Sequence, residues 1–465
     1  MRVVMIGGSD AGISAALRAR ELDPAAEVTV VLADVYPNFS ICGIPYYVSG
    51  EVTHWRNLAH RTIADLEAAG MRLRPGTTAR RIDVPGRKLL VTSPGGVEEL
   101  LGYDKLVVGT GALPVRPPIT GLAGPDALGP ADGVHLLHSM GDTFAVMHTL
   151  EEAAPASAII VGAGYIGLEM ADALTVRGLH VTQIEQLPEV LPTVDPQLGA
   201  LVHAELAGSG VEVLTGTTVQ AISKVPPGES GRLQVQATAA DGTTVTRAAD
   251  MVLVVVGVRP DTSLAADAGA TLGVKGAIAV DTCMRTSLPD VFAAGDCVMT
   301  HHRLLGETYL PLGTTAHKQG QVAGENALGG NRQFAGSLGT QVVKIFGQAA
   351  ARTGLRDHEA AAAGFDPVTV ESAADDHKAY YPGSHRITIR VTGDRATGRL
   401  LGMQLFGHKD AEIAKRIDVA AAAIYHGMTV DAVSDLDLSY TPPLGSPWDA
   451  VQLATQAWSR AAAST

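Results

Sequence analysis

Two stretches of the chain share one pattern of apolar and polar positions. Residues 2–34 and residues 158–186 each begin with a short apolar run rich in β-branched side chains, followed by a glycine turn. An alanine-rich segment and a second apolar run, which ends near an acidic residue, complete each stretch. Strand, glycine turn, helix and strand in this order form the βαβ unit that binds dinucleotides. The repeat therefore predicts an α/β fold with two Rossmann-like domains.

The second stretch has the complete glycine pattern. Gly162, Gly164 and Gly167 fill the three positions of GxGxxG, and Glu185 follows about 20 residues later. Such glycines let the backbone turn tightly and approach a pyrophosphate, which then lies on the amides at the helix N-terminus. The acid binds ribose hydroxyls, and Gln186 rather than an arginine follows it. We therefore expect this unit to prefer NADH over NADPH.

The first stretch departs from the pattern. Gly7 and Gly12 are present, but Ser9 occupies the middle position, and the nearest acid, Asp34, comes late. A single glycine turn would most simply be an ordinary connection between a strand and a helix. Two such turns in one chain, each in the same context, favour nucleotide binding. We expect the first unit to hold a second dinucleotide.

Two polar turns further along the chain are candidates for the same first site. Residues 107–111, VVGTG, predict a strand that runs into a turn containing Thr110 and Gly111. Residues 286–296, TSLPDVFAAGD, predict a strand that ends at Asp296. A carboxylate at that position can hydrogen-bond a polyol such as the ribityl chain of FAD. Taken alone, the same aspartate could simply cap a helix.

Composition and charge narrow the class of protein. The chain has 465 residues, of which 46% are apolar, enough for roughly two to four domains. Its net charge of −13 argues against nucleic acid or an anionic membrane as the main partner. We find neither a secretion signal nor an uncharged apolar run of about 18 residues. The three cysteines, Cys42, Cys283 and Cys297, do not suit a disulfide framework, so we expect a soluble cytoplasmic protein.

These motifs, taken in order, resemble the pyridine nucleotide-disulfide oxidoreductases, flavoproteins that move electrons from NAD(P)H through FAD to a cysteine. The resemblance covers nearly the whole chain. It implies an FAD-binding domain over 1–112 and 251–330, an inserted NAD(P)H-binding domain over 113–250, and a C-terminal α+β dimerisation domain over 331–465. The segment 113–130 is rich in proline and glycine, which suits a linker.

The segment 38–47, NFSICGIPYY, contains the cysteine to which the resemblance assigns the chemistry. Many members of the family carry two cysteines spaced C-x₄-C, but Tyr47 stands at the second position, so an internal disulfide is ruled out there. The segment resembles the single-cysteine branch, which includes coenzyme A-disulfide reductases, NADH oxidases and NADH peroxidases. In that branch the cysteine cycles between a thiolate and a mixed disulfide or a sulfenic acid. Gly43 and Pro45 suit the start of a helix, whose positive end is expected to lower the pKa of Cys42. The other two cysteines are expected to be packing residues.

The resemblance also assigns roles beside the flavin. Tyr165 resembles an aromatic gate that shields the flavin until nicotinamide enters, and Glu169 resembles the carboxylate near the nicotinamide. The segment 309–327 resembles the helix whose N-terminal amides face the pyrimidine edge of the flavin, with Thr315 and Ala316 as donors. A helix dipole there would stabilise negative charge on the reduced flavin. The alternative for the gate and the carboxylate is an ordinary place on a helix surface.

The C-terminal region lacks the His-Pro pair and the glutamate with which the two-cysteine members end. In coenzyme A-disulfide reductases, matching segments provide tyrosines that reach the active site of the other subunit. Carried over, Tyr440 and one of Tyr380 or Tyr381 would lie near Cys42 of the partner, where a phenol can protonate a leaving thiolate. The resemblance therefore implies an obligate homodimer whose partner chain completes each site. The alternative is that these tyrosines only pack the interface.

The choice of substrate depends on a few polar residues. Members that reduce peroxide or oxygen usually carry a histidine in the first glycine turn, where this chain has Asp10. A carboxylate supplies a proton less readily at neutral pH, which favours disulfide reduction. Coenzyme A carries phosphates, for which Arg18 and Arg61 are candidate contacts if they are not solvated surface charges. Asn38, at the start of the cysteine segment, is a further candidate for substrate binding.

The resemblance implies that NADH, or NADPH, reduces FAD, and that the electrons pass to a mixed disulfide between Cys42 and coenzyme A or a related thiol. Polysulfide and persulfide forms of the same carrier are equally compatible with one cysteine. Two alternatives stay open. One is an NADH oxidase or peroxidase that forms a sulfenic acid. The other is an electron-transfer or redox-sensing flavoprotein with little thiol turnover. We expect no metal ion in the site.

Overall fold

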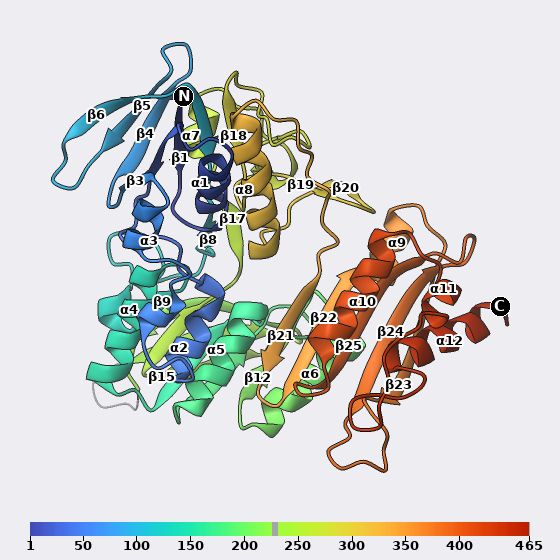
Figure 1. The fold of residues 1–465 in the computed structure, drawn as a ribbon. Helices are drawn as coiled ribbons and strands as arrows, with labels where there is room; N and C mark the ends of the chain where they lie inside the picture. Colours follow the sequence, from blue (N-terminus) through green and yellow to red (C-terminus); the bar gives the residue numbers. More distant parts are fainter. Residues whose placement is uncertain (226–230, 465) are drawn as a thin grey trace.

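Three large sheets organise the chain (Figure 1). The structure, a computed structural model, describes residues 1–225 and 231–464. Two of the sheets are parallel and five-stranded, and helices cover them. The third is five-stranded and antiparallel, and it belongs to the C-terminal part of the chain at the right of Figure 1. The predicted α/β fold with two Rossmann-like units and a C-terminal α+β unit is confirmed.

The first parallel sheet combines segments that are distant in the sequence, in the strand order β18-β7-β1-β2-β3. The central strand β1 is buried along most of its length, which explains its unbroken apolar run. Helices α1 and α8 lie side by side next to this sheet (Figure 1). The elements are β1 (Arg2–Ile6), α1 (Asp10–Leu22), β2 (Glu27–Val31), β3 (Met71–Arg74), β7 (Lys105–Val108), β18 (Val291–Ala293) and α8 (Gly313–Ala327).

The second parallel sheet has the strand order β12-β11-β10-β16-β9. Its β10-α5-β11 unit repeats β1-α1-β2, as the glycine pattern predicts. The elements are β9 (Val134–Leu136), α4 (Met140–His148), β10 (Ser157–Val161), α5 (Tyr165–Val176), β11 (His180–Ile184), β12 (Glu212–Leu214) and β16 (Met251–Val254).

One predicted border differs from the pairing of the strands. Residues 251–254, assigned above to the FAD-binding domain, form β16 and pair with β10 of the second sheet. The chain crosses back only afterwards, where β17 (Val258–Pro260) pairs with β8 (Ala112–Pro114). The run MVLVVVG suits a buried strand in either parallel sheet, so its apolar pattern alone does not decide between them.

Several short sheets and helices complete the first two units. One three-stranded antiparallel sheet is inserted in the chain between β3 and β7 and another between β12 and β16, and a two-stranded hairpin lies between β18 and α8. The strands are β4 (Thr78–Asp83), β5 (Lys88–Thr92), β6 (Glu98–Gly102), β13 (Thr217–Lys224), β14 (Leu233–Ala239), β15 (Thr244–Ala249), β19 (Thr300–His302) and β20 (Gly306–Thr308). The helices and helical turns are η1 (Ile41–Gly43), α2 (Ile44–Ser49), η2 (Trp55–Leu58), α3 (Ile63–Ala68), η3 (Pro130–Asp132), η4 (Thr149–Ala153), α6 (Pro196–Gly208), α7 (Ser263–Asp267) and η5 (Val274–Gly276).

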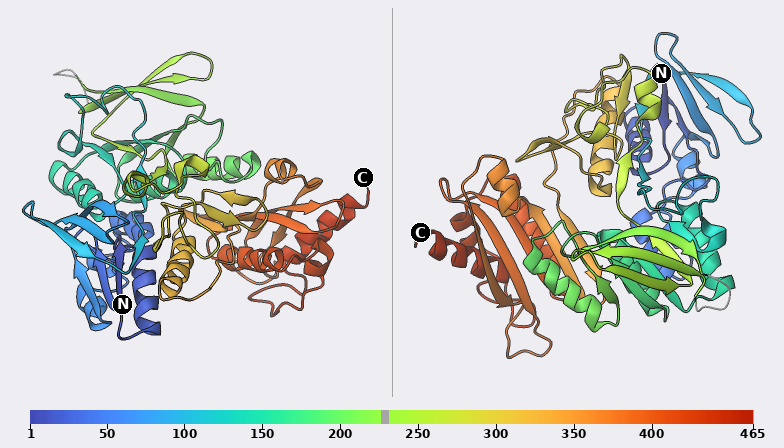
Figure 2. Two further views of the ribbon diagram at one scale, coloured as in Figure 1. Left: turned by 90° about the horizontal axis from the view of Figure 1, so that it is seen from above. Right: turned by 180° about the vertical axis from the view of Figure 1, so that it is seen from behind.

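The C-terminal sheet has the order β21-β22-β25-β24-β23. Helices α10 and α12 pack on it, and Trp458 of α12 donates its indole N–H to the carbonyl of Val368 at 2.7 Å. In both views of Figure 2, α6 of the second unit lies next to this sheet. The elements are β21 (Gln341–Ile345), β22 (Gln348–Gly354), α9 (Asp357–Ala362), β23 (Pro367–Asp375), β24 (Arg386–Asp394), β25 (Leu400–His408), α10 (Ile413–Tyr425), α11 (Val430–Ser434) and α12 (Ala450–Ala462).

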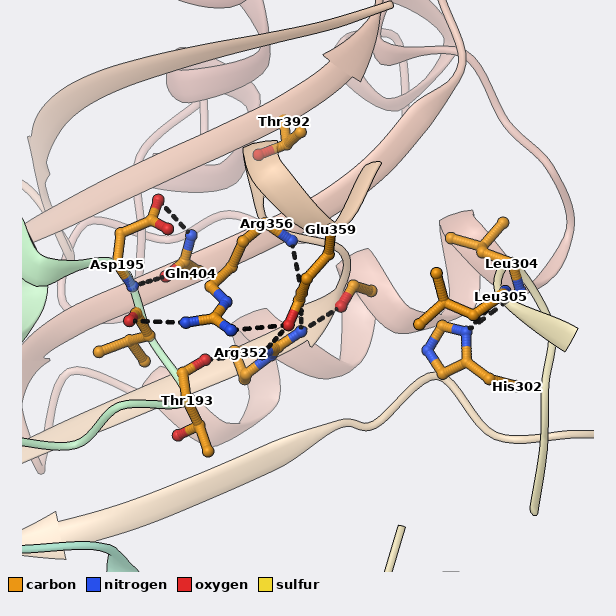
Figure 3. A network of polar contacts seen from close by, with 12 residues as sticks. Thr193, Asp195, His302, Leu304, Leu305, Arg352, Arg356, Glu359, Thr392 and Gln404 are labelled. Atoms are coloured by element: carbon orange, nitrogen blue, oxygen red, sulfur yellow. Dashed lines mark hydrogen bonds and ion pairs between the residues drawn. The ribbon is translucent and has the colours of Figure 1, made fainter. Parts of the chain in front are cut away.

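A buried polar clamp joins the second unit to the C-terminal sheet (Figure 3). Asp195, at the start of α6, is only 5% exposed and accepts hydrogen bonds from Arg390 Nε and Gln404 Nε2, both at 2.8 Å. Nearby, Arg352 donates to the carbonyl of Thr193 at 2.6 Å and pairs with Glu359 at 2.8 Å. These bonds fix the segment that follows the second glycine unit against β22, β24 and β25.

None of the helices in the described parts of the chain is long and apolar enough to cross a membrane.

Candidate active site

The first glycine turn packs so closely that two of its residues must be glycine. Gly7 has φ +110°, and a Cβ there would lie 2.0 Å from the carbonyl oxygen of Gly109. A Cβ on Gly12 would lie 2.0 Å from the carbonyl oxygen of Gly7. Ser9 is the N-cap residue of α1 but makes no capping hydrogen bond through its side chain. The turn therefore keeps its helix close and leaves this hydroxyl free for another partner.

Around this turn the structure provides a carboxylate suited to a polyol. Asp296 follows β18, and burial, followed by the charge of Asp10, raises the pKa of Asp296 to about 6. Within the described residues its carboxylate has no hydrogen-bond partner. Thr110 donates to the carbonyl of Asp261 at 2.5 Å, and Gly111 adopts φ +75°. A close glycine turn beside a desolvated, unpartnered carboxylate fits the sugar and phosphate parts of FAD.

Asp34, the predicted ribose ligand of the first unit, lies in the turn after β2. It is exposed, and its carboxylate accepts hydrogen bonds from the amides of Val35 at 2.6 Å and Tyr36 at 3.2 Å. The carboxylate therefore already organises the turn after β2. Its role toward a cofactor stays a prediction.

The second glycine turn is built in the same way and is more open. Cβ atoms on Gly162 and Gly167 would meet carbonyl oxygens at 2.6 Å and 2.1 Å, whereas a Cβ on Gly164 would meet nothing within 4 Å. Glu185 is 6% exposed and accepts hydrogen bonds from the amides of Ala163 at 2.7 Å and residue 187 at 2.8 Å. The acid is thus held beside the turn, where the family places the adenosine ribose of NAD(P)H.

Tyr165 and Glu169 both lie on α5 and are partly buried. The Tyr165 hydroxyl accepts a hydrogen bond from Thr193 at 3.0 Å and contacts Gln341 of β21, and burial raises its pKa to about 12. Glu169 accepts a hydrogen bond from the hydroxyl of Tyr46 at 3.2 Å, and burial raises its pKa to about 7. The predicted gate is therefore linked to the C-terminal sheet, and the predicted carboxylate to the cysteine segment.

A small polar cavity lies between α2, α5 and β21. Lys344 crosses it and pairs with Asp172 at 3.0 Å and with Glu51 at 3.1 Å. Tyr46 and Glu169 line the same cavity, and burial raises the pKa of Tyr46 well above its ordinary value. No sequence motif predicts Tyr46 or Lys344, because the polar groups of this cavity come from three separate segments.

Cys42 lies in η1, directly before α2, and it is exposed, whereas Cys283 and Cys297 are buried as predicted. Pro45 occupies the first turn of α2, as expected. The direction of the pKa shift differs from the prediction. Desolvation of the sulfur, followed by the charges of Glu169, Asp10 and Asp296, raises the pKa of the Cys42 thiol. Desolvation and the charges of these three carboxylates outweigh the predicted effect of the helix end, since α2 has only 6 residues.

Asn38 connects the cysteine segment to the first glycine turn. It adopts φ +56° and is 2% exposed. Its backbone amide donates to the carbonyl of Gly8 at 2.7 Å, and its backbone carbonyl accepts from the backbone amide of His60 at 2.9 Å. The side-chain Oδ1 is buried without a partner in the described part of the chain. A buried amide oxygen of this kind calls for a bound group, which suits a residue that faces a ligand.

A histidine that no motif predicts lies beside the first glycine turn. His317 of α8 contacts Asp10 of α1, with Nε2 and Oδ1 3.4 Å apart, and its Nδ1 lies 2.9 Å from the hydroxyl of Ser14. Thr315 and Ala316, the predicted flavin donors on the same helix, are buried, and both amides donate to the carbonyl of Leu312. Their role toward the flavin stays a prediction.

The predicted substrate contacts are scattered. Arg18 is engaged in ion pairs with Glu21 and Glu325, both at 2.7 Å, and Arg61 is exposed on the loop before α3. Three tyrosines of the C-terminal unit are exposed rather than packed within their own chain: Tyr380 at 74%, Tyr381 at 43% and Tyr440 at 45%. Their exposure leaves them available to a partner chain, and their roles stay predictions.

Comparison with known proteins identifies the family to which the chain belongs. Residues 1–320 match the family described as pyridine nucleotide-disulphide oxidoreductase, and residues 340–450 match its dimerisation domain. The chain therefore belongs to this family, and it is an FAD-dependent NAD(P)H oxidoreductase.

Similar proteins have related names. The chain is 32% identical over 459 residues, 98% of each chain, to a protein of Methanocaldococcus jannaschii named NADH oxidase. It is 34% identical over 450 residues, 96% of this chain and 97% of the relative, to the NAD(P)H sulfur oxidoreductase (CoA-dependent) of Pyrococcus furiosus. Among solved structures, an NAD-dependent persulfide reductase from A. fulgidus matches with a TM-score of 0.91 and 36% identity, over 100% of this chain and 84% of that one.

Proposed function

We propose that this protein uses NAD(P)H to reduce coenzyme A disulfide, or a related disulfide or persulfide, through the single sulfur of Cys42. The observation that carries the proposal is the position of this cysteine. It is the exposed one of the three, at the start of α2, and its segment is tied through Asn38 to the first glycine turn. The names of the relatives from Pyrococcus furiosus and A. fulgidus support the same substrate class.

When bound, FAD would pass the two electrons of each NAD(P)H to the sulfur. The residues of the chain prepare the other half of the reaction. Gly164 leaves room for the pyrophosphate of NAD(P)H, and Glu185 presents a fixed acceptor for its ribose, which favours NADH. Cys42, as a thiolate, attacks one sulfur of the substrate and releases the other as a thiolate. Desolvation of the sulfur, together with nearby carboxylates, raises the pKa of this thiol, so a cationic or polar group bound beside the sulfur would favour the thiolate.

We further propose that the protein is a cytoplasmic homodimer and that Tyr440, with Tyr380 or Tyr381, reaches the cysteine of the partner. The match of residues 340–450 to the dimerisation domain supports the assembly. Apolar and aromatic side chains near these tyrosines are also exposed, including Leu444 at 78% and Trp448 at 51%. A second copy of the chain is the partner that would cover them.

A second candidate is an NADH oxidase, and the name of the Methanocaldococcus jannaschii relative favours it. In that reaction Cys42 would become a sulfenic acid. Oxygen decides between the two. The proposed reductase consumes NADH with coenzyme A disulfide under anaerobic conditions, whereas the oxidase turns over only with oxygen or peroxide.

The direct test replaces the sulfur. Cys42→Ser should lower disulfide-dependent NADH oxidation by about 10³-fold or more, while NADH still reduces the bound flavin. Cys283→Ser is the matched control, because this cysteine is buried and lies outside the site. A fully active Cys42→Ser protein would refute the cysteine mechanism. The mass of the denatured protein, measured before and after reduction, identifies any thiol carried on the sulfur.

A further inference from the structure

One face of α8 is shaped to fit closely against α1. Gly313, His317, Gly320 and Gly324 are spaced four, three and four residues apart, so they lie on the same face of the helix. A Cβ on Gly320 would lie 2.3 Å from the carbonyl oxygen of residue 11, and one on Gly324 would lie 2.2 Å from that of residue 15. The glycines therefore bring the two helices into backbone contact, and His317 is the one large side chain on this face.

The close packing places the imidazole of His317 between two oxygen atoms of α1. Its Nδ1 lies 2.9 Å from Ser14 Oγ, and its Nε2 lies 3.4 Å from Asp10 Oδ1. Asp10 and Ser14 are four residues apart and share one face of α1. The charged form of the ring, which donates from both nitrogens, finds an acceptor at each. Because 3.4 Å is longer than a normal N–H···O hydrogen bond, the proton on Nε2 is not committed to the carboxylate.

The same ring lies next to the cysteine segment. Its centroid is 6.4 Å from that of His60. The amide of His60 donates to the carbonyl of Asn38 at 2.9 Å, and the amide of Ser40 donates to the carbonyl of residue 58 at 2.8 Å, so this loop pairs with the strand-like segment just before Cys42. The carboxylate of Asp10 also acts electrostatically on the sulfur of Cys42. The titratable groups facing His317 are thus Asp10 from α1 and His60 from the loop after η2.

We propose that His317, held between Asp10 and Ser14, gives the proton to the thiolate that leaves when Cys42 attacks its substrate. This inference rests on the proposed function. The histidine comes from a different helix than Asp10 and meets that aspartate in space.

The step balances in atoms and electrons. The Cys42 thiolate attacks one sulfur of R–S–S–R, so that a new S–S bond forms to the cysteine while the old S–S bond breaks and releases R–S⁻. The imidazolium of His317 transfers a proton to R–S⁻ and becomes neutral, and its exposed edge takes a proton back from water. NAD(P)H then supplies two electrons and one proton, which would reach the mixed disulfide by way of bound FAD, cleave it, release the second R–SH and restore the Cys42 thiolate. Each cycle consumes one NAD(P)H and one proton and produces two R–SH.

The test compares His317→Gln with the wild type in anaerobic NADH oxidation with coenzyme A disulfide. Glutamine keeps a polar group that can bond Ser14 but supplies no proton near neutral pH. We expect kcat to fall about 100-fold and its pH profile to change shape, while the reduction of the flavin by NADH without disulfide stays at the wild-type rate. A variant that keeps wild-type kcat and the wild-type pH profile would overturn the proposal.

A second readout does not use turnover. Asp10 raises the pKa of Cys42, and a positive charge on His317, beside Asp10, offsets the charge of that carboxylate. In His317→Gln the rate of Cys42 alkylation by iodoacetamide at roughly pH 6, where a histidine side chain ordinarily carries charge, should therefore fall, as followed by mass spectrometry. A histidine that serves only helix packing would leave this rate unchanged, and that result would also count against the proposal.

Two controls separate the possible failures. Ser14→Ala removes the interhelical hydrogen bond but keeps the imidazole, so it should lower thermal stability more than activity. His358→Gln changes an exposed histidine of α9, so it should lower neither thermal stability nor activity. If wild-type protein oxidises NADH with neither coenzyme A disulfide nor a related disulfide or persulfide, or if Cys42→Ser oxidises NADH normally with one of them, the proposed function fails and the inference fails with it. If both of those results stand and His317→Gln is fully active, only the inference fails.

Discussion

Glu169 is a carboxylic acid that the fold holds partly away from water. Burial raises its pKa from 4.5 to about 7, although Tyr46 donates a hydrogen bond to it. The folded chain therefore binds this proton more tightly than the unfolded chain does. Its contribution lowers the free energy of unfolding progressively as pH rises from about 4.5 to about 7, and the full loss persists above that range.

Replacing this acid should remove the pH dependence. We expect Glu169→Gln to raise stability by about 1–3 kcal/mol at pH 8 and to change it little near pH 4.5, because glutamine can still accept the bond from Tyr46. Thermal unfolding midpoints at the two pH values measure the difference. Glu67→Gln, at an exposed position of α3, is the control. An equal effect of Glu169→Gln at both pH values would contradict this account.

At the residue scale, the sequence predicts the groups that belong to one local motif. The glycines of both turns, Glu185 and the exposed cysteine all belong to short patterns, and the structure places them in turns or at a helix start. It does not predict His317, whose partners lie about 300 positions away. The predicted direction of the pKa shift at Cys42 is wrong because the fold desolvates the sulfur, and the three carboxylates that add to this effect come from three distant segments.

At the scale of elements, the clamp around Asp195 joins α6 to the C-terminal sheet. Arg390 of β24 has a side chain that is only 14% exposed, and it pairs with both Asp195 and Glu371. In Asp195→Ala it would keep only Glu371 of these two partners. We expect a loss of about 2–4 kcal/mol, because a mostly buried charge loses its buried partner. Thermal unfolding measures the loss. Glu371→Gln removes the exposed partner of the same arginine and should cost less than about 1 kcal/mol. Equal losses for both variants would argue against the clamp.

The contact between α1 and α8 makes a second prediction at this scale. Gly320→Ala places a methyl group 2.3 Å from a carbonyl oxygen of α1, so the helices must separate, and we expect a loss of about 1–3 kcal/mol. Gly208→Ala is the matched control, because a Cβ there meets nothing within 4 Å at the end of α6. The control should be neutral or slightly stabilising, as alanine favours helix. Unfolding curves and the flavin content of both proteins measure the outcome.

The order of strands and helices was predictable in the two βαβ units, because the apolar positions of strands and of helices recur with different periods. The assignment of β16 was not, because strands buried on both faces have the same apolar sequence in either parallel sheet. Only the strand pairing identifies the sheet to which residues 251–254 belong.

At the scale of the whole molecule, the proposed shared active site can be tested with mixed dimers. Differently tagged Cys42→Ser and Tyr440→Phe chains, expressed together and purified as the heterodimer, should contain one site with both wild-type residues. We expect this heterodimer to be more active than either mutant homodimer, because each site would take its cysteine and its tyrosine from different chains. Leu453→Ala, at a partly exposed position of α12, is the control. If the heterodimer is no more active than the more active of the two mutant homodimers, Tyr440 would have only a packing role.

The first sheet is completed by β18, which the ribosome makes long after β7 and only once the whole second sheet has been synthesised. A nascent chain that stops before residue 291 lacks this edge strand, Asp296 and α8 together. We therefore expect the flavin to bind only after α8 has been made, and fragments truncated before α8 should lack yellow colour even when their first hundred residues are intact.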